Sequence, residues 1–432
     1  MRRNLMPNIL IISTSDTGGG AAIAAYRLMS ALKSEGVNVK MIVREKCSDN
    51  PDVIPVGNRY KNRWNFYHER GVIFLHNRLS RDHLFDVSIA NSGVSITEME
   101  EYKKADIIHL HWINQGMLSI GEIAKILKSG KKVVWTLHDM WSFTGICHHA
   151  AGCDHYENGC GHCPYLKAPS RDDLSHNIFR RKESAYAGGK ITFVACSNWL
   201  KELAEKSPLT RNHHLVSIPN PIDTDIYRPM DRKEIRKKLC LPLDKKIILF
   251  AAVKAADKRK GTDYLVEAAR LMVQRSDDLL FLIAGKRGEE VMQQLSLPAR
   301  SMGYLSPQQM PELYNASDLF VTPSLQENLP NTIMEAMSCG TPCLGFSIGG
   351  IPEMINHRIN GYVAEYKNAQ DLAAGLDWIL FKADYEALSV QARKKVLEKY
   401  AQEQVIQQYR AIYDAEVDCK IQLHEGEQQN NR

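Results

Sequence analysis

Two glutamates, Glu327 and Glu335, stand among apolar residues in the most informative stretch of the sequence. Pro330 suits the first turn of a helix and Gly340 suits the position past its end, so a short helix is expected over about 330–339. A helix N-terminus attracts a phosphate, and the two carboxylates could hold hydroxyl groups on either side of it. A surface helix with two solvated glutamates is the alternative, and the apolar neighbours argue against it.

A second stretch carries cations directly after the apolar run Ile247–Ala252. Its basic residues are Lys254, Lys258, Arg259 and Lys260. Cations beyond the carboxyl end of a strand could neutralise a diphosphate without a metal ion. The alternative is a solvated run of charges, but the glycine and the helix start that follow favour phosphate binding.

The first domain offers two further candidates. Gly18, Gly19 and Gly20 lie between an expected strand and a helix, where the backbone could approach an anion closely. The pattern is not G-x-G-x-x-G, so it does not indicate a dinucleotide site, and a tight turn is the alternative. His138 follows the buried strand Val133–Leu137 and is expected to point into a ligand crevice, unless it merely precedes a capping aspartate.

Four cysteines fall within one short segment: Cys147, Cys153, Cys160 and Cys163. The last two have the C-x-x-C spacing of zinc ligands, and His149 and His155 are further candidates. The gap between the first two is wider than is usual for zinc sites. A structural zinc site and a loop lined by reduced thiols therefore both stay open.

Short apolar runs alternate with amphipathic helical segments along most of the chain. This alternation indicates parallel sheets covered by helices, which bind ligands beyond the carboxyl ends of their strands. The boundary between two such domains is expected near residues 220–245. A helix over 385–416 is expected to cross back to the first domain. The expected strands are Asn8–Ile12, Val37–Val43, Ile107–Leu110, Val133–Leu137, Thr192–Ala195, Ile247–Ala252, Leu280–Ala284, Leu319–Thr322 and Cys343–Phe346.

The composition sets outer limits on function. The chain has 432 residues, of which 24% are charged, and a net charge of +5. Such a composition is typical of a globular protein, and the small positive excess argues against a nucleic-acid binder. No apolar run approaches the roughly 18 residues that span a bilayer, and the N-terminus lacks a signal-peptide core. A cytoplasmic protein is expected.

Taken together, these motifs resemble those of retaining glycosyltransferases of family 4. The resemblance runs from Gly18 to about Ala401. It is most specific at Glu327-x7-Glu335 with the following Ala336–Pro342 and at Gly349–Glu353. The stretch Trp135–Gly145 and the cysteines after it resemble a subgroup from bacterial capsule and exopolysaccharide pathways.

The resemblance implies the α/β GT-B fold, in which two doubly wound Rossmann-like domains face a central cleft. The expected boundaries are 1–222 for an acceptor-binding domain and 223–395 for a nucleotide-sugar-binding domain. A crossing helix over 396–418 and a polar tail over 419–432 would follow.

The resemblance also implies roles for individual residues. Glu327 would bind hydroxyls of the donor sugar, Glu335 the ribose, and Lys260 the diphosphate. His138 would contact the sugar near the reacting carbon. Other donor-site residues would be Gly19, Gly20, Leu329, Pro330, Asn331 and a second cation. Because Val253-Lys254 stands where the family usually has Gly-Arg, that cation could be Lys254 or Arg259. No cofactor is expected for catalysis.

The expected activity is sugar transfer from a UDP- or GDP-sugar to a glycan or polyprenyl-linked acceptor in cell-surface polysaccharide synthesis. A nucleotide-sugar epimerase, a phosphorylase and a non-catalytic scaffold remain alternatives. The segment Tyr60–Tyr67 mixes basic and aromatic residues and could contact a membrane surface. A partly buried helix with solvated charges is the alternative there.

Overall fold

The computed structural model describes residues 7–414, which form two compact units. Unit 1 runs to Pro219 and resumes at Val405, and unit 2 is Asn220–Gln404. The sequence placed the first boundary at 222/223 and the second at 395/396. The expected polar tail over 419–432, and the last residues of the expected crossing helix, lie outside the described residues.

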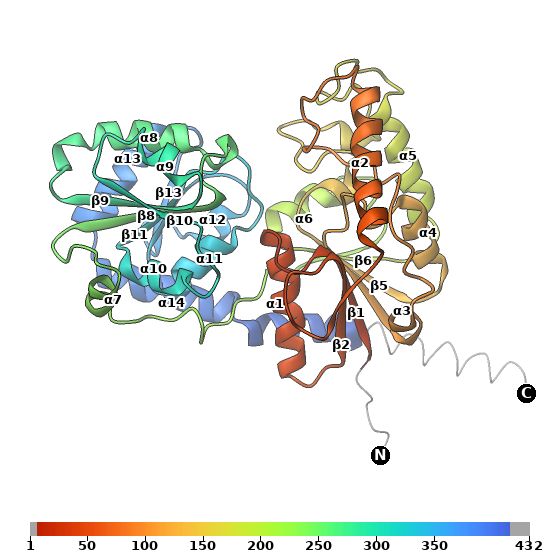
Figure 1. Ribbon diagram of the computed structural model, residues 1–432, viewed down its shortest axis with the longest axis horizontal. Coiled ribbons are helices and arrows are strands. Elements are labelled where there is room, and N and C mark those ends of the chain that lie inside the picture. The colour runs from red at the N-terminus through yellow and green to blue at the C-terminus, as the bar shows by residue number, and fades with distance from the viewer. Residues whose placement is uncertain (1–6, 415–432) are drawn as a thin grey trace, which may run out of the picture. The chain divides into compact units, whose positions relative to one another are not determined.

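Unit 1 is built on a seven-stranded parallel sheet in the order β3-β2-β1-β4-β5-β6-β7. Helices lie over the sheet (Figure 1), and the inner strand β1 is buried along its whole length because both faces are covered. The strands are β1 Ile9–Ser15, β2 Val39–Glu45, β3 Val53–Pro55, β4 Ile107–Leu110, β5 Lys132–Leu137, β6 Thr192–Ala195 and β7 His214–Ser217.

The helices of unit 1 include one from the far end of the chain. Those from the first half are α1 Gly20–Ser34, α2 Arg59–His76, α3 Glu100–Lys104, α4 Ile120–Lys128, α5 Leu174–Tyr186 and α6 Asn198–Glu205, with 3-10 turns η1 Trp141–Phe143 and η2 His155–Asn158. A last helix over 402–414 packs Val405, Ile406, Tyr409 and Tyr413 into the core beneath α1. This late segment therefore belongs to the hydrophobic core of the first unit.

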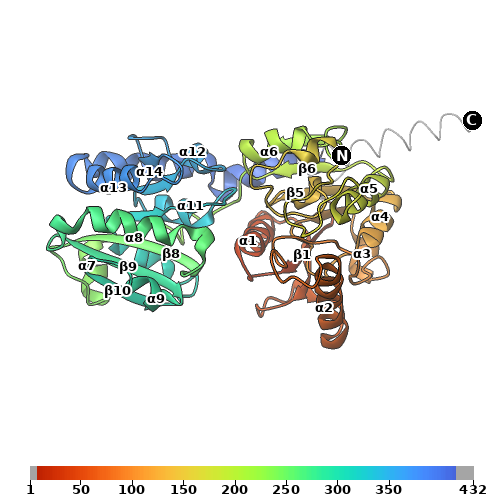
Figure 2. The same ribbon diagram turned by 90° about the horizontal axis from the view of Figure 1, so that it is seen from above.

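Unit 2 has a six-stranded parallel sheet in the order β10-β9-β8-β11-β12-β13. Its helices flank that sheet, as the view from above also shows (Figure 2). The strands are β8 Lys246–Lys254, β9 Leu279–Lys286, β10 Ala299–Gly303, β11 Leu319–Thr322, β12 Cys343–Phe346 and β13 Gly361–Ala364. The helices are α7 Arg232–Lys238, α8 Thr262–Leu271, α9 Gly288–Met292, α10 Met310–Ala316, α11 Asn331–Ser338, α12 Ile351–Met354, α13 Ala369–Asp377 and α14 Tyr385–Lys399, with short turns η3 Lys258–Lys260, η4 Val273–Arg275 and η5 Trp378–Lys382.

The predicted alternation of strands and helices in two parallel sheets is confirmed, but the single helix over 385–416 is wrong. α14 ends at Lys399, and a second helix covers 402–414. Between them, Ala401 forms a parallel bridge with Ile222. Ile222 donates to the carbonyl of Tyr400 and accepts from the N–H of Gln402, both at 3.0 Å. A backbone segment that pairs with another extended segment cannot continue a helix, so the helix is interrupted at Tyr400 and Ala401.

Four strands were missed. β3 has three residues, and β7, at the edge of its sheet, begins with an exposed histidine and is only partly buried. β10 reads Ala-Arg-Ser-Met-Gly and β13 reads Gly-Tyr-Val-Ala, so neither is a continuous apolar run. These segments become strands because a neighbouring strand edge is available to pair with them.

Candidate active site

In unit 2, the predicted residues Lys260 and Glu327 lie together. Nζ of Lys260 is 2.5 Å from Oε1 of Glu327, and the lysine side chain is 34% exposed. Lys260 ends the turn η3 after β8, and Glu327 lies in the loop after β11, the neighbouring strand. Parallel strands bring these two loops to the same edge of the sheet. The result is a partly exposed ion pair where a ligand of this fold is expected.

Two glycines allow the loops to close on this pair. Gly261 has φ 70°, and a Cβ there would stand 1.8 Å from the carbonyl oxygen of Pro323. Gly349 has φ 58°, and a Cβ there would stand 2.0 Å from the carbonyl oxygen of Glu327. Any other residue would push one loop away from the other. The Gly-rich turn after β12 therefore fits against the backbone that presents Glu327.

The helix α11 supplies the other predicted donor-site residues. Glu335 is buried, and its Oε2 accepts a hydrogen bond of 2.8 Å from the hydroxyl of Tyr314. The helix begins at Asn331, and Pro330 before it gives no side-chain cap. Leu329 and Pro330 are buried. The positive end of this helix is therefore not occupied by a capping side chain of the preceding residue.

The two candidates for the second cation differ in their partners. Nη2 of Arg259 lies 2.8 Å from Oδ2 of Asp257. Burial alone would raise the pKa of Asp257, but hydrogen bonds from Arg259 lower it below its usual value. Lys254 is exposed at the end of β8 and forms no ion pair with any residue in 7–414. The side chain of Lys254 is thus the freer of the two to meet an anion.

In unit 1, His138 lies at the carboxyl end of β5, as predicted. Its Nε2 is 2.9 Å from Nδ1 of His111, and its Nδ1 is 3.6 Å from Sγ of Cys196. His111 follows β4 and Cys196 follows β6, the strands on either side of β5. The sheet order therefore fixes the ring of His138 between two neighbours.

A third histidine extends this cluster inward. The ring of His109 lies 4.3 Å from that of His111, centroid to centroid. Its Nε2 is 2.7 Å from Oγ1 of Thr136 and its Nδ1 is 2.8 Å from the hydroxyl of Tyr413. Tyr409 also hydrogen-bonds Thr136, at 2.9 Å. The helix over 402–414 thus fixes the histidine cluster from below.

The cluster is held in the neutral form. Burial lowers the pKa of His138 to about 4 and that of His109 to about 3, and it lowers the pKa of His111 well below the ordinary value. Nε2 of His111 is buried and has no hydrogen-bond partner among the described residues. A neutral imidazole can donate or accept a hydrogen bond, so this edge suits an uncharged polar group such as a sugar hydroxyl.

Gly19 and Gly20 lie after the carboxyl end of β1, at the same edge of the sheet. Gly19 has φ 109°, and a Cβ there would meet nothing within 4 Å. It precedes α1 without a side-chain cap. The predicted open backbone approach is present, whereas neighbouring Asp16 has a structural role because its carboxylate accepts from the N–H groups of Cys47 and Ser48.

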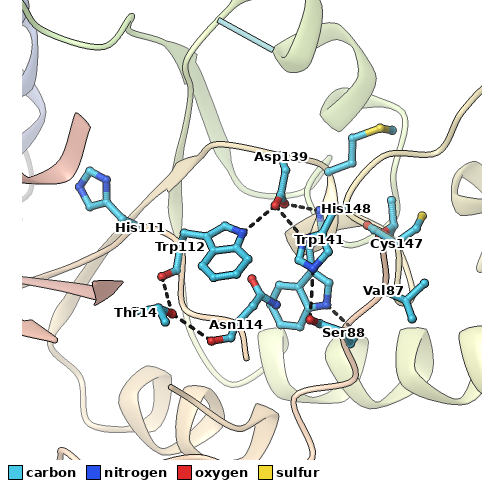
Figure 3. Close-up of polar contacts among 12 residues, drawn as sticks. Thr14, Val87, Ser88, His111, Trp112, Asn114, Asp139, Trp141, Cys147 and His148 are labelled. Carbon is cyan, nitrogen blue, oxygen red and sulfur yellow. Dashed lines mark hydrogen bonds and ion pairs between the residues drawn. The ribbon is translucent and has the colours of Figure 1, made fainter. Parts of the chain in front are cut away.

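Sequence reasoning missed the network around Asp139. Its Oδ2 accepts from Nε1 of Trp112 at 2.7 Å and lies 2.7 Å from Nδ1 of His148, as Figure 3 shows. Burial would raise the pKa of Asp139, but the charge and hydrogen bond of His148 lower it to about 2. The other ring nitrogen of His148, Nε2, forms a hydrogen bond of 3.1 Å with Oγ of Ser88. Asp139 also accepts from the N–H of Trp141, but the residue at the N-cap of the turn η1 is Met140, which gives no side-chain cap.

The four predicted metal-ligating residues line one cavity of about 20 Å³, together with His155 and Tyr156. Burial raises the pKa of Cys160 to about 12 and that of Cys163 to about 11, and it also raises that of Cys147, so these thiols are protonated at neutral pH when no metal is bound. Beside the cavity, buried Lys182 donates to the carbonyl of Thr144 at 3.0 Å and lies over the ring of Trp141. Burial lowers the pKa of Lys182 to about 7.

Zinc needs deprotonated ligands in tetrahedral geometry. Within residues 7–414, no three His, Cys, Asp or Glu side chains are arranged so that they could hold a metal ion. The structure therefore gives the zinc site no support, and the predicted ligands Cys147, Cys153, Cys160 and Cys163 remain a prediction. Metal analysis of the purified chain tests it, and about one zinc per chain is the value that the prediction requires.

The cluster residues His109 and His111 carried a signal that could have found them. His109 lies in β4 and His111 directly follows that strand, so the alternation of an extended chain puts both on one face, and β4 pairs with β5, the strand that presents His138. Their tyrosine partners could not be found in this way, because Tyr409 and Thr136 are 273 residues apart.

Two family models match successive parts of the chain. Residues 18–226 match the family described as Glycosyltransferase Family 4, and residues 231–396 match Glycosyl transferases group 1. The gap between the two matches, at residues 227–230, follows a few residues after unit 2 begins at Asn220.

Individual relatives agree with these matches. N-acetyl-alpha-D-glucosaminyl L-malate synthase of Bacillus anthracis is 27% identical, with 76% of this chain and 79% of the relative covered. UDP-Gal:alpha-D-GlcNAc-diphosphoundecaprenol alpha-1,3-galactosyltransferase of Escherichia coli is 23% identical, with 76% and 80% covered. The fold is similar to that of sucrose-phosphate synthase from Thermosynechococcus elongatus, with a TM-score of 0.67, 18% identity and coverage of 96% and 100%. The chain thus carries the two domains of a GT-B glycosyltransferase, a family 4 domain followed by a group 1 domain.

Proposed function

We propose that this chain is a retaining glycosyltransferase. It moves a sugar from a nucleotide-diphosphate sugar to a hydroxyl of a glycan or polyprenyl-linked glycan in cell-surface polysaccharide synthesis. The observation that carries the proposal is the partly exposed pair of Lys260 and Glu327 beside the uncapped start of α11. The name of the Escherichia coli relative, with a UDP-sugar donor and a diphosphoundecaprenol-linked acceptor, supports these classes of donor and acceptor.

In this proposal Lys260 binds the donor diphosphate. When the bond between sugar and phosphate breaks, negative charge builds on the leaving group, and a fixed cation stabilises that charge. Lys260 is paired with Glu327 in the structure, so its ammonium group is already held in place. When the donor binds, the diphosphate replaces the carboxylate of Glu327 as the partner of this ammonium group. The N-terminus of α11 adds a positive dipole end. The proposal needs no metal ion, because side chains can supply the positive charge.

The second cation is proposed to be Lys254. Arg259 is bound to Asp257, so its use would require that ion pair to open. Lys254 is exposed and has no carboxylate within ion-pair distance in the described part of the chain. A lysine gives a point charge rather than the bidentate contact of arginine, and a point charge suffices to offset a phosphate oxygen.

The remaining predicted residues bind the neutral parts of the donor. Glu327 accepts from hydroxyls of the transferred sugar, and buried Glu335 accepts from those of the ribose. His138 makes a neutral hydrogen bond to the sugar, which its lowered pKa favours. Backbone groups complete the donor site at Gly19, Gly20, Leu329, Pro330 and Asn331.

The chemistry proceeds with retention of configuration. An oxocarbenium-like centre forms on the sugar as the diphosphate departs, and a leaving-group oxygen takes the proton of the acceptor hydroxyl. No side chain is assigned as a nucleophile. The protein acts in the cytoplasm, where nucleotide sugars are made.

A binding and transfer experiment tests this proposal. Thermal unfolding of the full chain is measured with UDP, GDP and their sugars, because a ligand at 100 times its Kd adds about 2.7 kcal/mol to the free energy of unfolding. The stabilising donor is then incubated with a polyprenyl-diphosphate sugar, and the anomeric configuration of the product is read by NMR. Lys260→Ala should lose both stabilisation and transfer, whereas Lys258→Ala, from an exposed position in the same turn, should keep both.

Each outcome separates one part of the proposal. Transfer with an inverted anomer would overturn retention but not the glycosyltransferase. Nucleotide binding without transfer to any glycan acceptor would favour a scaffold. The absence of any response to nucleotides would overturn the donor site itself.

A further inference from the structure

The helix α2 turns a row of large apolar side chains toward solvent. Tyr60, Trp64, Tyr67 and Leu75 are 85%, 68%, 57% and 66% exposed. Their spacing of four, seven and fifteen residues from the first puts them on one side of the helix. Leu79, just past the helix end, is also largely exposed. α2 lies along one side of its unit in both views (Figures 1 and 2), and we call this row the α2 outer face.

The opposite side of α2 is buried and carries charged as well as apolar side chains, among them Glu69, Arg70 and Ile73. Oε1 of Glu69 accepts from the N–H groups of Ile89 and Ala90 at 2.8 and 2.9 Å. Arg70 donates to the carbonyl of Val87 at 2.9 Å and to Ser88. A surface helix normally buries its apolar side and exposes its polar side. Here Ile73 packs into the core and the charged side chains of Glu69 and Arg70 are committed to these hydrogen bonds, so the helix cannot roll over to bury its aromatic rings.

Exposed cations lie on the same helix and in the segment just past its end. They are Arg59, Lys61, Arg63, Arg78 and Arg81. None of the five forms an ion pair with a residue in 7–414, although Arg63 lies over the ring of Tyr67. The one acidic residue between 58 and 81 is the buried Glu69. The outer face therefore joins aromatic rings to a positive charge that no carboxylate of this segment offsets.

We propose that the α2 outer face docks the protein on the surface of an anionic lipid bilayer. Tryptophan and tyrosine prefer the interface between headgroups and acyl chains, where a ring is partly apolar and partly wet. Exposed arginine and lysine are attracted to anionic headgroups. A helix with both features lies in the plane of the interface. No helix among the described residues is long and apolar enough to cross a membrane.

Cosedimentation with vesicles tests the docking surface directly, without reference to catalysis. The full chain should bind vesicles that contain phosphatidylglycerol and should not bind pure phosphatidylcholine. The triple variant Tyr60→Ser, Trp64→Ser, Tyr67→Ser should reduce the partition coefficient by about tenfold or more, because the rings that enter the interface are gone. Tyr304→Ser removes a ring that is 59% exposed in unit 2 and should leave binding unchanged.

A second measurement locates the contact. Brominated lipids should quench tryptophan fluorescence in the parent chain, and Trp64→Phe should keep vesicle binding but lose most of the quenching. Equal binding by the triple variant and the parent, or equal binding to neutral and anionic vesicles, would overturn the proposal. So would a failure to bind any vesicle combined with capture of a protein partner through these rings. Vesicle binding is measured without glycosyl transfer, and each of these results can occur whether transfer is intact or lost. A failure of the docking proposal is therefore distinguishable from a failure of the proposed function.

Discussion

The carboxyl edge of the seven-stranded sheet holds neutral imidazoles, whereas the same edge of the six-stranded sheet holds ion pairs. In unit 1, burial keeps His109 and His138 uncharged far below neutral pH. In unit 2, Lys260 meets Glu327 and Arg259 meets Asp257 in partly exposed loops. Two sheets of one architecture thus present different chemistry, because the loops after their strands differ in burial and charge. The charged edge suits a diphosphate, and the neutral edge suits hydroxyl groups.

The largest expected effect would come from the charged edge. Lys260→Ala should lower kcat/KM by about 100-fold or more, because losing a fixed group that stabilises developing charge costs about 2.7–4 kcal/mol. Steady-state kinetics with the stabilising donor measure it. Lys254→Ala should come next and Arg259→Ala last. The reverse order would show that the ion pair with Asp257 opens when the donor binds.

The partner of Lys260 should behave differently. Glu327→Ala should lower kcat by about 10-fold to 100-fold, the cost of a hydrogen bond to a charged group. It should not weaken UDP or GDP binding, because Lys260 loses a competitor for the phosphate. Calorimetric titration of the nucleotide beside kcat separates the two effects. Equal turnover by variant and parent would contradict the role of Glu327.

The neutral edge should appear in the pH dependence of stability. Below pH 6.5 the unfolded chain binds a proton at each histidine, whereas the folded chain keeps His138 neutral down to about 4 and His109 down to about 3. The free energy of unfolding should therefore fall by about 1.4 kcal/mol per pH unit for each histidine as the pH drops below 6.5. Denaturant unfolding at several pH values measures the slope, and His138→Gln should reduce it. An unchanged slope in that variant would mean that His138 is protonated in the folded chain.

The smallest effect would come from the support beneath the histidines. Tyr413→Phe leaves Nδ1 of His109 without its partner at 2.8 Å, which should cost about 1–3 kcal/mol of unfolding free energy. Tyr304→Phe, from an exposed ring, is the control and should cost nothing measurable. If both variants unfold alike, the helix over 402–414 does not hold the cluster.

The two edges also differed in how well the sequence predicted them. Glu327, Glu335 and Lys260 lie in short segments with clear turn and helix signals, so local patterns were enough to find them. His111 was missed although it contacts His138, because the contact depends on strand order rather than on neighbours in sequence. Asp139 appeared only in the capping alternative for the His138 motif, since its hydrogen bond from Trp112 also crosses between neighbouring strands.

The strands likewise divide into those that a local sequence pattern predicts and those that depend on a distant partner. Continuous apolar runs such as β8 were predicted because hydrophobicity alone marks a strand buried on both faces. β7 was not, because it takes its structure from pairing with β6. The break between α14 and the last helix was invisible because it depends on Ile222, far away in the sequence.

The return of residues 405–414 to unit 1 has a consequence for synthesis. Unit 2 is one continuous stretch, whereas the core of unit 1 needs Val405, Tyr409 and Tyr413. A ribosome that adds about 5–20 residues per second takes roughly 10 to 40 seconds to pass from Pro219 to Val405. Throughout that interval the strands of the first unit have been synthesised, but His109 and the sheet around it lack their last covering helix. The synthesis of unit 2 is therefore complete before that of unit 1, although the first residue of unit 2 is translated later.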